Sequence, residues 1–165
     1  MPSVECTLNG DWSQAKRYLA LLPKFIKALQ HNIAADVSEE YYQALVDHFK
    51  AQDLPLAPLS AWYKEWKVKR GLDTRILIAT GQMLDSIKKS PIKDGKAFVG
   101  IKGGKRHRGS KLDIALIALM HEYGDPARNV PARPVYRLTA EELKDKLQPV
   151  LQTIVNRTRV EVFGV

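Results

Sequence analysis

The chain has 165 residues, of which 45% are hydrophobic and 27% charged, and its formal net charge is +8 at pH 7. This length fits one domain with a real hydrophobic core, and no apolar run reaches the roughly 18 residues that a membrane span needs. The single cysteine, Cys6, excludes an intramolecular disulfide and a cysteine-rich zinc site, and the N-terminus lacks the features of a signal peptide, so we expect a soluble protein of a reducing compartment.

Residues 11–50 predict two helices. The first begins at Asp11 or Ser13, either of which can cap it, and ends before Pro23. Pro23 fits the first turn of a second helix, which we expect to reach Lys50, about 27 residues and roughly 40 Å long. A helix of this length can pack along a neighbouring subunit. Its apolar stripe contains Phe25, Ile26, Leu29, Ile33, Val37, Tyr41, Leu45 and Phe49.

A proline-containing break at residues 53–59 precedes a short basic helix, which Ser60 caps and Gly71 closes. Aromatic and basic side chains alternate on this helix: Trp62, Tyr63, Lys64, Trp66, Lys67, Lys69 and Arg70. Interleaved aromatic and basic groups can bind nucleic acid by stacking. The alternative, which we favour for this helix, is an aromatic stripe that faces the core with solvated lysines around it.

The positive charge is concentrated in the middle of the chain. Residues 51–110 carry 13 basic and 5 acidic side chains, whereas residues 1–50 carry 5 and 6, and residues 111–165 carry 8 and 7. Such asymmetry indicates a segment that faces a polyanion or an acidic partner. A lysine-rich face that contacts only solvent explains the same counts, so both interpretations remain open.

A short helix is predicted around Gln82–Ile87, with Thr80 as its cap. Two strands follow at Lys89–Ile92 and Lys96–Ile101, and Asp94-Gly95 between them favours a tight hairpin turn. We therefore expect a small antiparallel sheet in this region.

The segment KGGKRHRGSK, residues 102–111, contains no apolar side chain and cannot pack into a core. We expect an exposed and mobile loop that faces DNA or an acidic partner, with little protection from hydrogen exchange in the free subunit. Its basic residues are Lys102, Lys105, Arg106, His107, Arg108 and Lys111.

The apolar positions Leu112, Ala115, Leu116 and Leu119 predict a helix that Gly124 ends. A stiff connector follows, because Pro131 and Pro134 hold their own φ angles and keep the preceding residues extended. It carries Arg128 and Arg133, so it either links the two helices or contacts another subunit.

The last helix is predicted to begin near Thr139, where Thr139 and Glu142 form a capping box. Its core stripe contains Leu143, Leu147, Val150, Leu151 and Ile154. The tail RVEVFGV, residues 159–165, has the composition of an edge strand.

No catalytic or metal motif is complete. His121-Glu122 begins a zinc-protease motif, but Asp125 occupies the position of the second histidine. The segment Gly104–Lys111 has the glycines of a phosphate loop with its lysine and serine in the wrong order. We therefore predict no enzyme, no metal and no cofactor.

Several short motifs occur in a recognisable order over residues 59–145. They are Leu59-Ser60, Ile76-Leu77, Thr80-Gly81-Gln82-Met83-Leu84 with Ser86-Ile87, Val99-Gly100, His121-Glu122-Tyr123-Gly124 and Val130-Pro131-Ala132-Arg133-Pro134. This order resembles that of the tailed-bacteriophage virion-morphogenesis and tail-completion proteins, also described as head–tail joining or minor tail proteins. The chain departs from the family's usual pattern at Asp125 and at Val135-Tyr136, where the family commonly has threonine or glycine and a phenylalanine.

The resemblance implies an α+β fold with long N-terminal helices, a small, mostly antiparallel sheet and C-terminal helices. It implies one domain, residues 1–165, with an N-terminal helical segment, 1–52, and a family-like segment, 53–165. The function implied is that of a structural virion protein of the phage neck. By family resemblance it forms a homo-oligomeric ring of six subunits around the DNA channel. The alternative is a basic nucleic-acid-binding module.

The implied partners are portal-adaptor, tail-tube or tail-terminator proteins and genomic DNA, without a membrane, and the implied location is the virion neck or tail after assembly in the host cytoplasm. The residues expected at subunit or neck interfaces are His121, Tyr123, Arg128, Arg133 and Tyr136. Arg133 in particular is predicted to serve assembly rather than folding. In the internal alternative, it pairs with Glu122 or Asp125 of its own chain.

Overall fold

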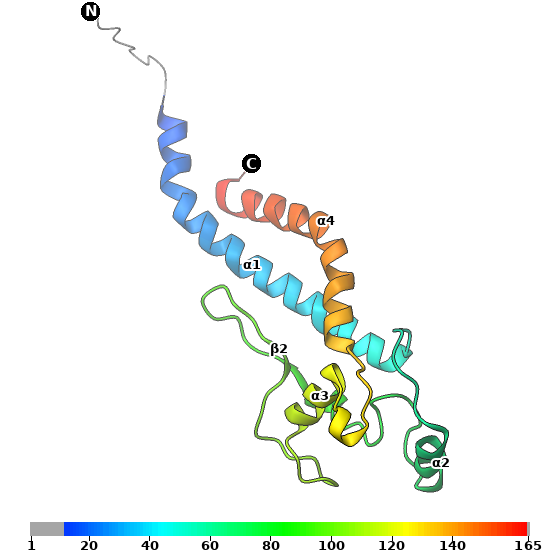
Figure 1. Ribbon diagram of the computed structural model, residues 1–165. Coiled ribbons are helices and arrows are strands. Elements are labelled where there is room, and N and C mark those ends of the chain that lie inside the picture. Colours follow the sequence, from blue (N-terminus) through cyan, green and yellow to red (C-terminus); the bar gives the residue numbers. More distant parts are fainter. Residues whose placement is uncertain (1–11, 165) are drawn as a thin grey trace, which may run out of the picture.

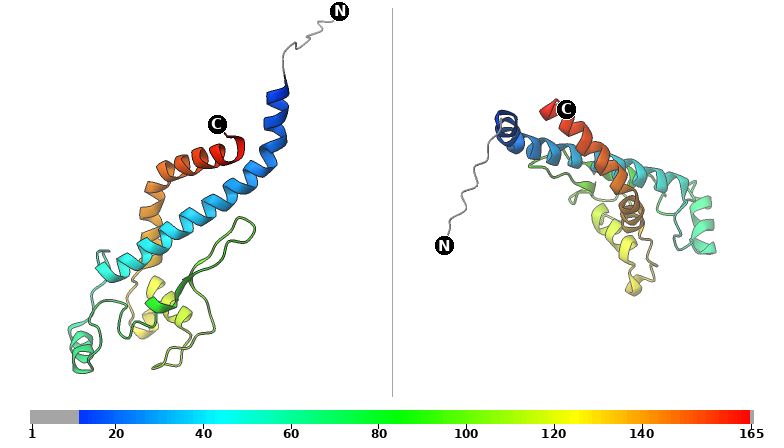
Figure 2. Two further views of the ribbon diagram at one scale, coloured as in Figure 1. Left: turned by 180° about the vertical axis from the view of Figure 1, so that it is seen from behind. Right: turned by 90° about the horizontal axis from the view of Figure 1, so that it is seen from above.

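The computed structural model describes residues 12–164, and this part of the chain has the predicted α+β fold. Its elements are α1 (Ser13–Ala51), α2 (Ala61–Lys69), the 3₁₀ helix η1 (Leu84–Ser86), β1 (Ile87–Lys89), β2 (Val99–Ile101), α3 (Ile114–Tyr123), the 3₁₀ helix η2 (Pro126–Arg128) and α4 (Val135–Phe163). Figure 1 shows that the long helices α1 and α4 run beside each other, with the sheet, α2 and α3 gathered near the C-terminal half of α1. The protein is elongated in all three views (Figures 1 and 2).

Helix α1 is one helix, so the prediction of two helices divided at Pro23 is wrong. Pro23 lies inside it, and the first turns of α1 are inclined to the rest of the helix in Figure 1. A proline ring removes one backbone hydrogen bond and bends a helix without necessarily ending it. The carbonyl that loses its donor is that of Leu19, an exposed residue, so water can satisfy it.

Helix α4 also differs from the prediction. It begins at Val135 rather than near Thr139, and the buried Thr139 hydroxyl donates to the Val135 carbonyl instead of capping a helix. The tail predicted as an edge strand is helical as far as Phe163. Pro149 lies inside the helix, and Figure 1 shows a bend between its orange and red halves.

The bent helices α1 and α4 pack against each other over much of their length. Near the C-terminus, the ring of Phe163 lies 5.5 Å from Tyr18 and 5.2 Å from Phe25 between centroids. The Asn32 amide donates to the Thr158 hydroxyl, which is fully buried. Aromatic contacts and one satisfied polar pair therefore hold the two helices together at this end.

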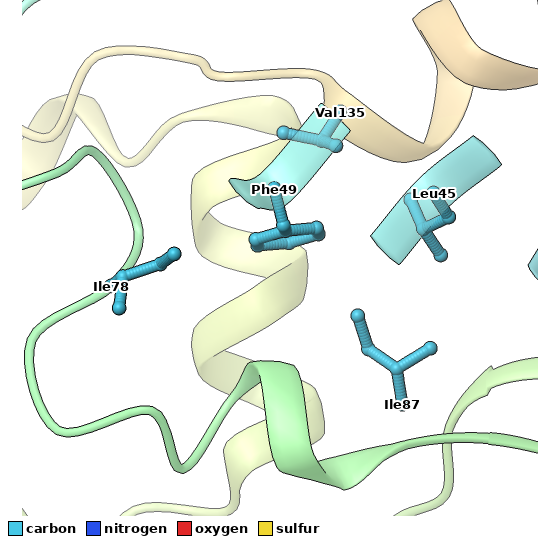
Figure 3. Close-up of a cluster of buried hydrophobic side chains, with 5 residues drawn as sticks. All are labelled: Leu45, Phe49, Ile78, Ile87 and Val135. Atoms are coloured by element: carbon cyan, nitrogen blue, oxygen red, sulfur yellow. The ribbon is translucent and has the colours of Figure 1, made fainter. Parts of the chain in front are cut away.

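The hydrophobic core lies where the C-terminal half of α1 meets the sheet and the start of α4. Figure 3 shows its buried side chains, which are Leu45, Phe49, Ile78, Ile87 and Val135. Phe49 also contacts the ring of Tyr136, at 6.3 Å between centroids. The remaining buried apolar residues, Ile114, Ala118, Leu143 and Ile154, belong to α3 and α4.

The two strands pair antiparallel, with Ile87 opposite Ile101 and Lys89 opposite Val99. They are shorter than predicted, and β1 begins two residues before the expected Lys89. The predicted turn at Asp94-Gly95 is confirmed, because both residues have positive φ angles, 51° and 67°, between the bridged Lys93 and Lys96. This turn lies against α1: a Cβ atom on Gly95 would come within 3.0 Å of the Gln30 Cβ.

Candidate functional site

Residues 12–164 form a cleft of about 1350 Å³. It lies between α2, the segment 77–85, the basic loop 102–111, α3 and the proline-rich connector. It brings together six basic residues from these elements: Lys67, His107, Arg108, His121, Arg128 and Arg133. We take this cleft as the candidate site.

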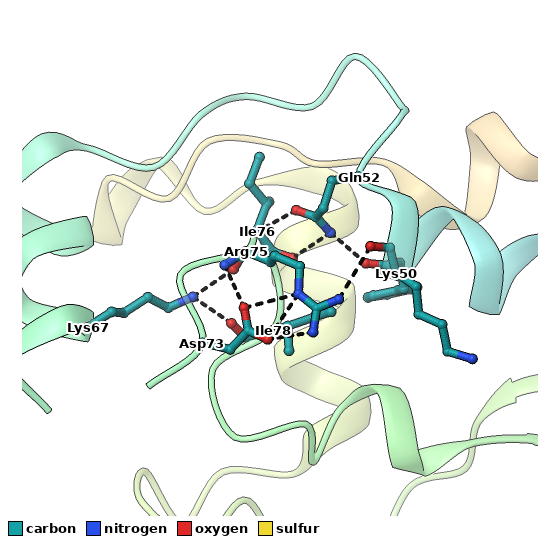
Figure 4. A network of polar contacts seen from close by, with 8 residues as sticks. Lys50, Gln52, Lys67, Asp73, Arg75, Ile76 and Ile78 are labelled. Atoms are coloured by element: carbon teal, nitrogen blue, oxygen red, sulfur yellow. Dashed lines mark hydrogen bonds and ion pairs between the residues drawn. The ribbon is translucent and has the colours of Figure 1, made fainter. Parts of the chain in front are cut away.

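Helix α2 forms one wall of the cleft. Its cap is the one predicted, since the Ser60 hydroxyl accepts a hydrogen bond from the Tyr63 amide. The face of α2 that packs against the protein carries a lysine: Lys67 is only 2% exposed, and its ammonium donates to the carbonyls of Arg75 and Ile78 at 2.7 and 2.6 Å (Figure 4).

These two carbonyls belong to a segment that is itself fixed to the end of α1. Gln52 exchanges hydrogen bonds with the backbone of Ile76, and Arg75 donates to the Lys50 carbonyl while pairing with Asp73 (Figure 4). Lys67 therefore attaches α2 to a segment that α1 has already ordered.

The favoured interpretation of α2 as a helix with a core-facing aromatic stripe is wrong for its outermost ring. Trp62 is 71% exposed. The rings of Tyr63 and Trp66 stack at 5.4 Å and 17°, and the Arg70 guanidinium lies 4.2 Å from the centre of the Trp66 ring. Because Lys67 occupies the contact with the protein, the aromatic rings line the cleft and its rim instead.

Arg133 is buried, which corrects the prediction that its side chain is free for a neighbouring subunit. It is 6% exposed, its Nε donates to the Ala57 carbonyl at 2.8 Å, and its Nη2 donates to the Pro58 carbonyl at 3.1 Å. It is an internal residue as in the alternative, but its partners are backbone carbonyls rather than a carboxylate. Arg133 thus fastens the connector to the break before α2.

His121 lies next to these cations in the cleft wall. Burial, and then the positive charges of Arg133 and Lys67, lower its pKa to about 4, so its ring is neutral at pH 7. Its Nδ1 atom is buried and has no hydrogen-bond partner among the described residues.

The low pKa of His121 predicts a loss of stability in acid. An unfolded histidine titrates near 6.5, so between pH 6.5 and 4 the unfolded chain binds more protons than the folded one, and stability falls as pH falls. At pH 5 the expected loss relative to pH 7 is about 2 kcal/mol. Urea unfolding at both pH values should show that His121→Gln removes most of this difference, whereas exposed His31→Gln should leave it. If the free energy of unfolding depends on pH equally in wild type and His121→Gln, His121 is not the cause of the loss in acid.

Glu122, next to His121, has a structural role. It is 8% exposed, and its two carboxylate oxygens accept from the backbone amides of Tyr136 and Arg137 at 3.0 and 2.9 Å. These amides lie in the first turn of α4, where a negative charge is favourable. The cap of α4 therefore comes from α3 and not from the predicted Thr139 and Glu142.

The other residues predicted at interfaces are divided between two faces. Arg128 lines the cleft and pairs with Asp125. Tyr123 is 70% exposed and lies with Tyr136 beside a second, smaller groove next to β2. The Tyr136 hydroxyl is buried and has no described partner. The structure thus brings His121, Arg128 and Arg133 together and separates them from the two tyrosines.

The basic loop is exposed, as predicted, but it is not without structure. His107 and Leu112 are joined by a backbone hydrogen bond, and the Ile114 amide donates to the Lys105 carbonyl. The Asp113 carboxylate accepts from the amides of Gly104 and Ala115, and these hydrogen bonds lower the pKa of Asp113. The loop is therefore a turn closed at its base, and its mobility and its partner stay predictions.

Only part of this loop faces the cleft. His107 and Arg108 line it, and the Arg108 amide donates to the Gln82 side chain at 3.0 Å. Lys102, Lys105, Arg106 and Lys111 do not line it.

The burial of Lys67 and an exposed apolar surface on α3 were not predicted from the sequence. Lys67 follows Tyr63 by one helical turn, but nothing in the sequence separates it from the solvated Lys64 and Lys69. The sequence does carry a signal for the α3 surface, since Leu112, Leu116, Leu119 and Tyr123 recur at helical spacing. That spacing alone does not tell whether this side of the helix faces the core or the solvent. Only the structure shows that the buried half is Ile114, Ala118 and Glu122.

One protein in the comparisons resembles this chain over most of its length. It is the uncharacterized protein MJ0331 of Methanocaldococcus jannaschii, which is 26% identical over 142 residues, or 86% of this chain and 98% of its own. No protein-family model matches the chain, and no solved structure matches it significantly.

None of the helices in residues 12–164 is both long and apolar enough to cross a membrane. Within the same residues, no group of three or more histidine, cysteine, aspartate or glutamate side chains is arranged to hold a metal ion.

Proposed function

We propose that the chain is a non-catalytic subunit of a homo-oligomeric ring in the neck of a tailed-phage virion, where it completes the tail or joins head to tail around the DNA channel. The proposal of an oligomer rests on the exposed apolar surface of α3. Leu116, Leu119 and Tyr123 are 46%, 54% and 70% exposed, and Leu112, which precedes α3, is also exposed. A contiguous apolar surface of this kind marks an interaction site.

A second apolar stripe supports the same proposal. Trp12, Leu19 and Ile26 follow one another at seven-residue intervals on α1, and Leu22 lies between the last two; all four are exposed. Seven-residue spacing keeps side chains on one face of a helix that packs against another helix. This face differs from the one that carries Tyr18 and Phe25, which contact α4.

The two apolar surfaces lie at opposite ends of an elongated subunit. Figures 1 and 2 show the N-terminal end of α1 far from α3 in each view. Two different surfaces on one subunit favour heterologous contacts, in which one surface binds the other surface of the next subunit. Such contacts close into a ring when a whole number of equal rotations between neighbours completes a full turn. The neck location and the phage partners are proposed from the family resemblance over residues 59–145.

The double variant Leu116→Glu, Leu119→Glu is expected to abolish the ring. Two buried carboxylates without partners would strongly oppose an apolar contact, whereas the isolated subunit should lose at most about 0.5 kcal/mol because both side chains are exposed in it. Light scattering should show a mass close to the 18.6 kDa subunit in place of a multiple of it. Negative-stain images should show rings for the wild type alone.

Val68→Glu is the matched control, since it makes the same chemical change at an exposed position on α2. We expect it to leave the mass unchanged. A wild-type protein that stays monomeric at high concentration, or a double variant that still forms rings, would refute the proposal.

The second candidate function is that of a nucleic-acid-binding module. The exposed Trp62, the Tyr63–Trp66 stack and the nearby Arg108 favour it. A monomer that binds DNA tightly and loses that binding steeply with salt would support this candidate over the ring.

A further inference from the structure

The cleft contains two buried cations without an anionic partner. Lys67 and Arg133 are 2% and 6% exposed, and neither forms an ion pair with any residue of the described chain. A buried charge is costly unless a counter-charge or hydrogen bonds compensate for it. The four backbone carbonyls that accept from these two side chains supply dipoles but no net charge.

The acidic residues near these cations do not fill that role. Asp73 influences Lys67, but the Asp73 carboxylate is held by the Arg75 guanidinium at 2.6 Å. Asp85 is the one carboxylate in the cleft lining, and it is exposed. The wall formed by Lys67 and Arg133 therefore keeps an uncompensated positive charge.

His121 lies beside this charge and has an unused hydrogen-bonding atom. Its buried Nδ1 has no partner among the described residues. His121, Arg133 and Lys67 line the same cleft, and the Arg133 backbone amide donates to the His121 carbonyl. One buried, unsatisfied nitrogen next to two unpaired cations indicates a place for an acceptor oxygen.

The rest of the lining is largely apolar. Leu72, Leu77, Met83 and Ile117 line the interior, the rings of Tyr63 and Trp66 form one side, and Trp62 stands exposed at the rim. A ligand that complements this lining therefore has apolar side chains. It also has a carboxylate on a side chain narrow enough to approach Lys67 and Arg133. A nucleic-acid strand fits less well, because its phosphates carry bulky sugars and the two cations are only 2% and 6% exposed.

We propose that this cleft binds an acidic, apolar segment of a protein partner, with one of its side-chain carboxylates beside Lys67, Arg133 and His121. The carboxylate supplies the missing negative charge and accepts from the guanidinium, and the apolar side chains pack against Tyr63, Trp66 and Trp62. This inference does not depend on ring formation, since the cleft lies within a single subunit.

The test uses the full chain and a labelled acetylated hexapeptide, Leu-Glu-Phe-Glu-Leu-Glu-amide, with the matched peptide in which glutamine replaces every glutamate. Fluorescence anisotropy is expected to give at least tenfold tighter binding of the acidic peptide. Nuclear magnetic resonance should show a rise in the pKa of His121 when that peptide is bound, because a carboxylate favours the protonated ring. A labelled ten-residue oligothymidylate is the competing probe.

Trp62→Ala should weaken acidic-peptide binding at least fivefold without unfolding the protein, because Trp62 is exposed. Val68→Ala, on the same helix but outside the cleft lining, is the matched control and should bind as wild type. Lys67→Met, once circular dichroism has shown that it is folded, should remove the preference for glutamate over glutamine.

Equal binding of the two peptides, no binding of either, or an unmoved His121 pKa in the complex would overturn the proposal. Tighter binding of oligothymidylate, with displacement of the peptide, would replace it with the nucleic-acid interpretation. A failed ring alters the mass and leaves these measurements intact, so the two proposals can fail separately.

Discussion

Glu122→Ala is expected to lower the free energy of unfolding by about 3–4 kcal/mol. The substitution leaves the amides of Tyr136 and Arg137 without their acceptor and removes a negative charge from the positive end of α4. For a chain of this size, the melting temperature should fall by roughly 10 °C. Thermal unfolding followed by circular dichroism measures this change.

Two further variants show whether the cap is the cause. Glu122→Gln keeps the size of the side chain and one acceptor oxygen, so it should lie between wild type and Glu122→Ala. Glu65→Ala makes the same change at an exposed helical position on α2 and should change stability by at most about 0.5 kcal/mol. If Glu122→Ala and Glu65→Ala have the same melting temperature, Glu122 does not cap α4.

Arg133→Met should destabilise the isolated subunit by about 3 kcal/mol, before any assembly takes place. The variant removes the donors from the carbonyls of Ala57 and Pro58 and releases the connector from the break before α2. Part of this loss is offset, because removing one of two neighbouring cations relieves repulsion with Lys67. Urea unfolding of the monomeric protein measures the net effect.

The exposed Arg159→Met is the control for Arg133→Met and should have little effect. Arg133→Lys distinguishes charge from geometry, because a lysine cannot span two carbonyls with a fixed fork of donors. We expect Arg133→Lys to be nearly as unstable as Arg133→Met. An Arg133→Met subunit that melts as wild type would restore the prediction that this residue serves assembly alone.

The sequence predicted those parts of the fold that depend on local chemistry. Ser60 caps α2 and Asp94-Gly95 turns the hairpin, because each needs only its own few neighbours to do so. The predictions at Pro23 and Thr139 were wrong because packing overrode them. The contacts of α1 with α4 hold it as one helix through Pro23, and Glu122 caps α4 from a different element.

The candidate site was predicted only in part, for a related reason. The stiffness of the connector around Arg133 could be inferred from Pro131 and Pro134, but the place where its guanidinium points could not. Its acceptors lie 76 and 75 residues away in the sequence. The burial of Lys67 likewise depends on the position of the segment 73–78, which the end of α1 fixes.

The contact between the hairpin turn and α1 has a consequence for how this sequence can diverge. At position 95 any side chain would need a positive φ, and its Cβ would lie 3.0 Å from the Gln30 Cβ, so glycine is strongly favoured while the hairpin stays on α1. At Gly71 a Cβ would meet nothing within 4 Å, so the positive φ of 64° is the one obstacle there, and asparagine tolerates such an angle better than most residues. Among distant homologues, a glycine retained at position 95 amid changing neighbours would trace the descent of this hairpin–helix contact.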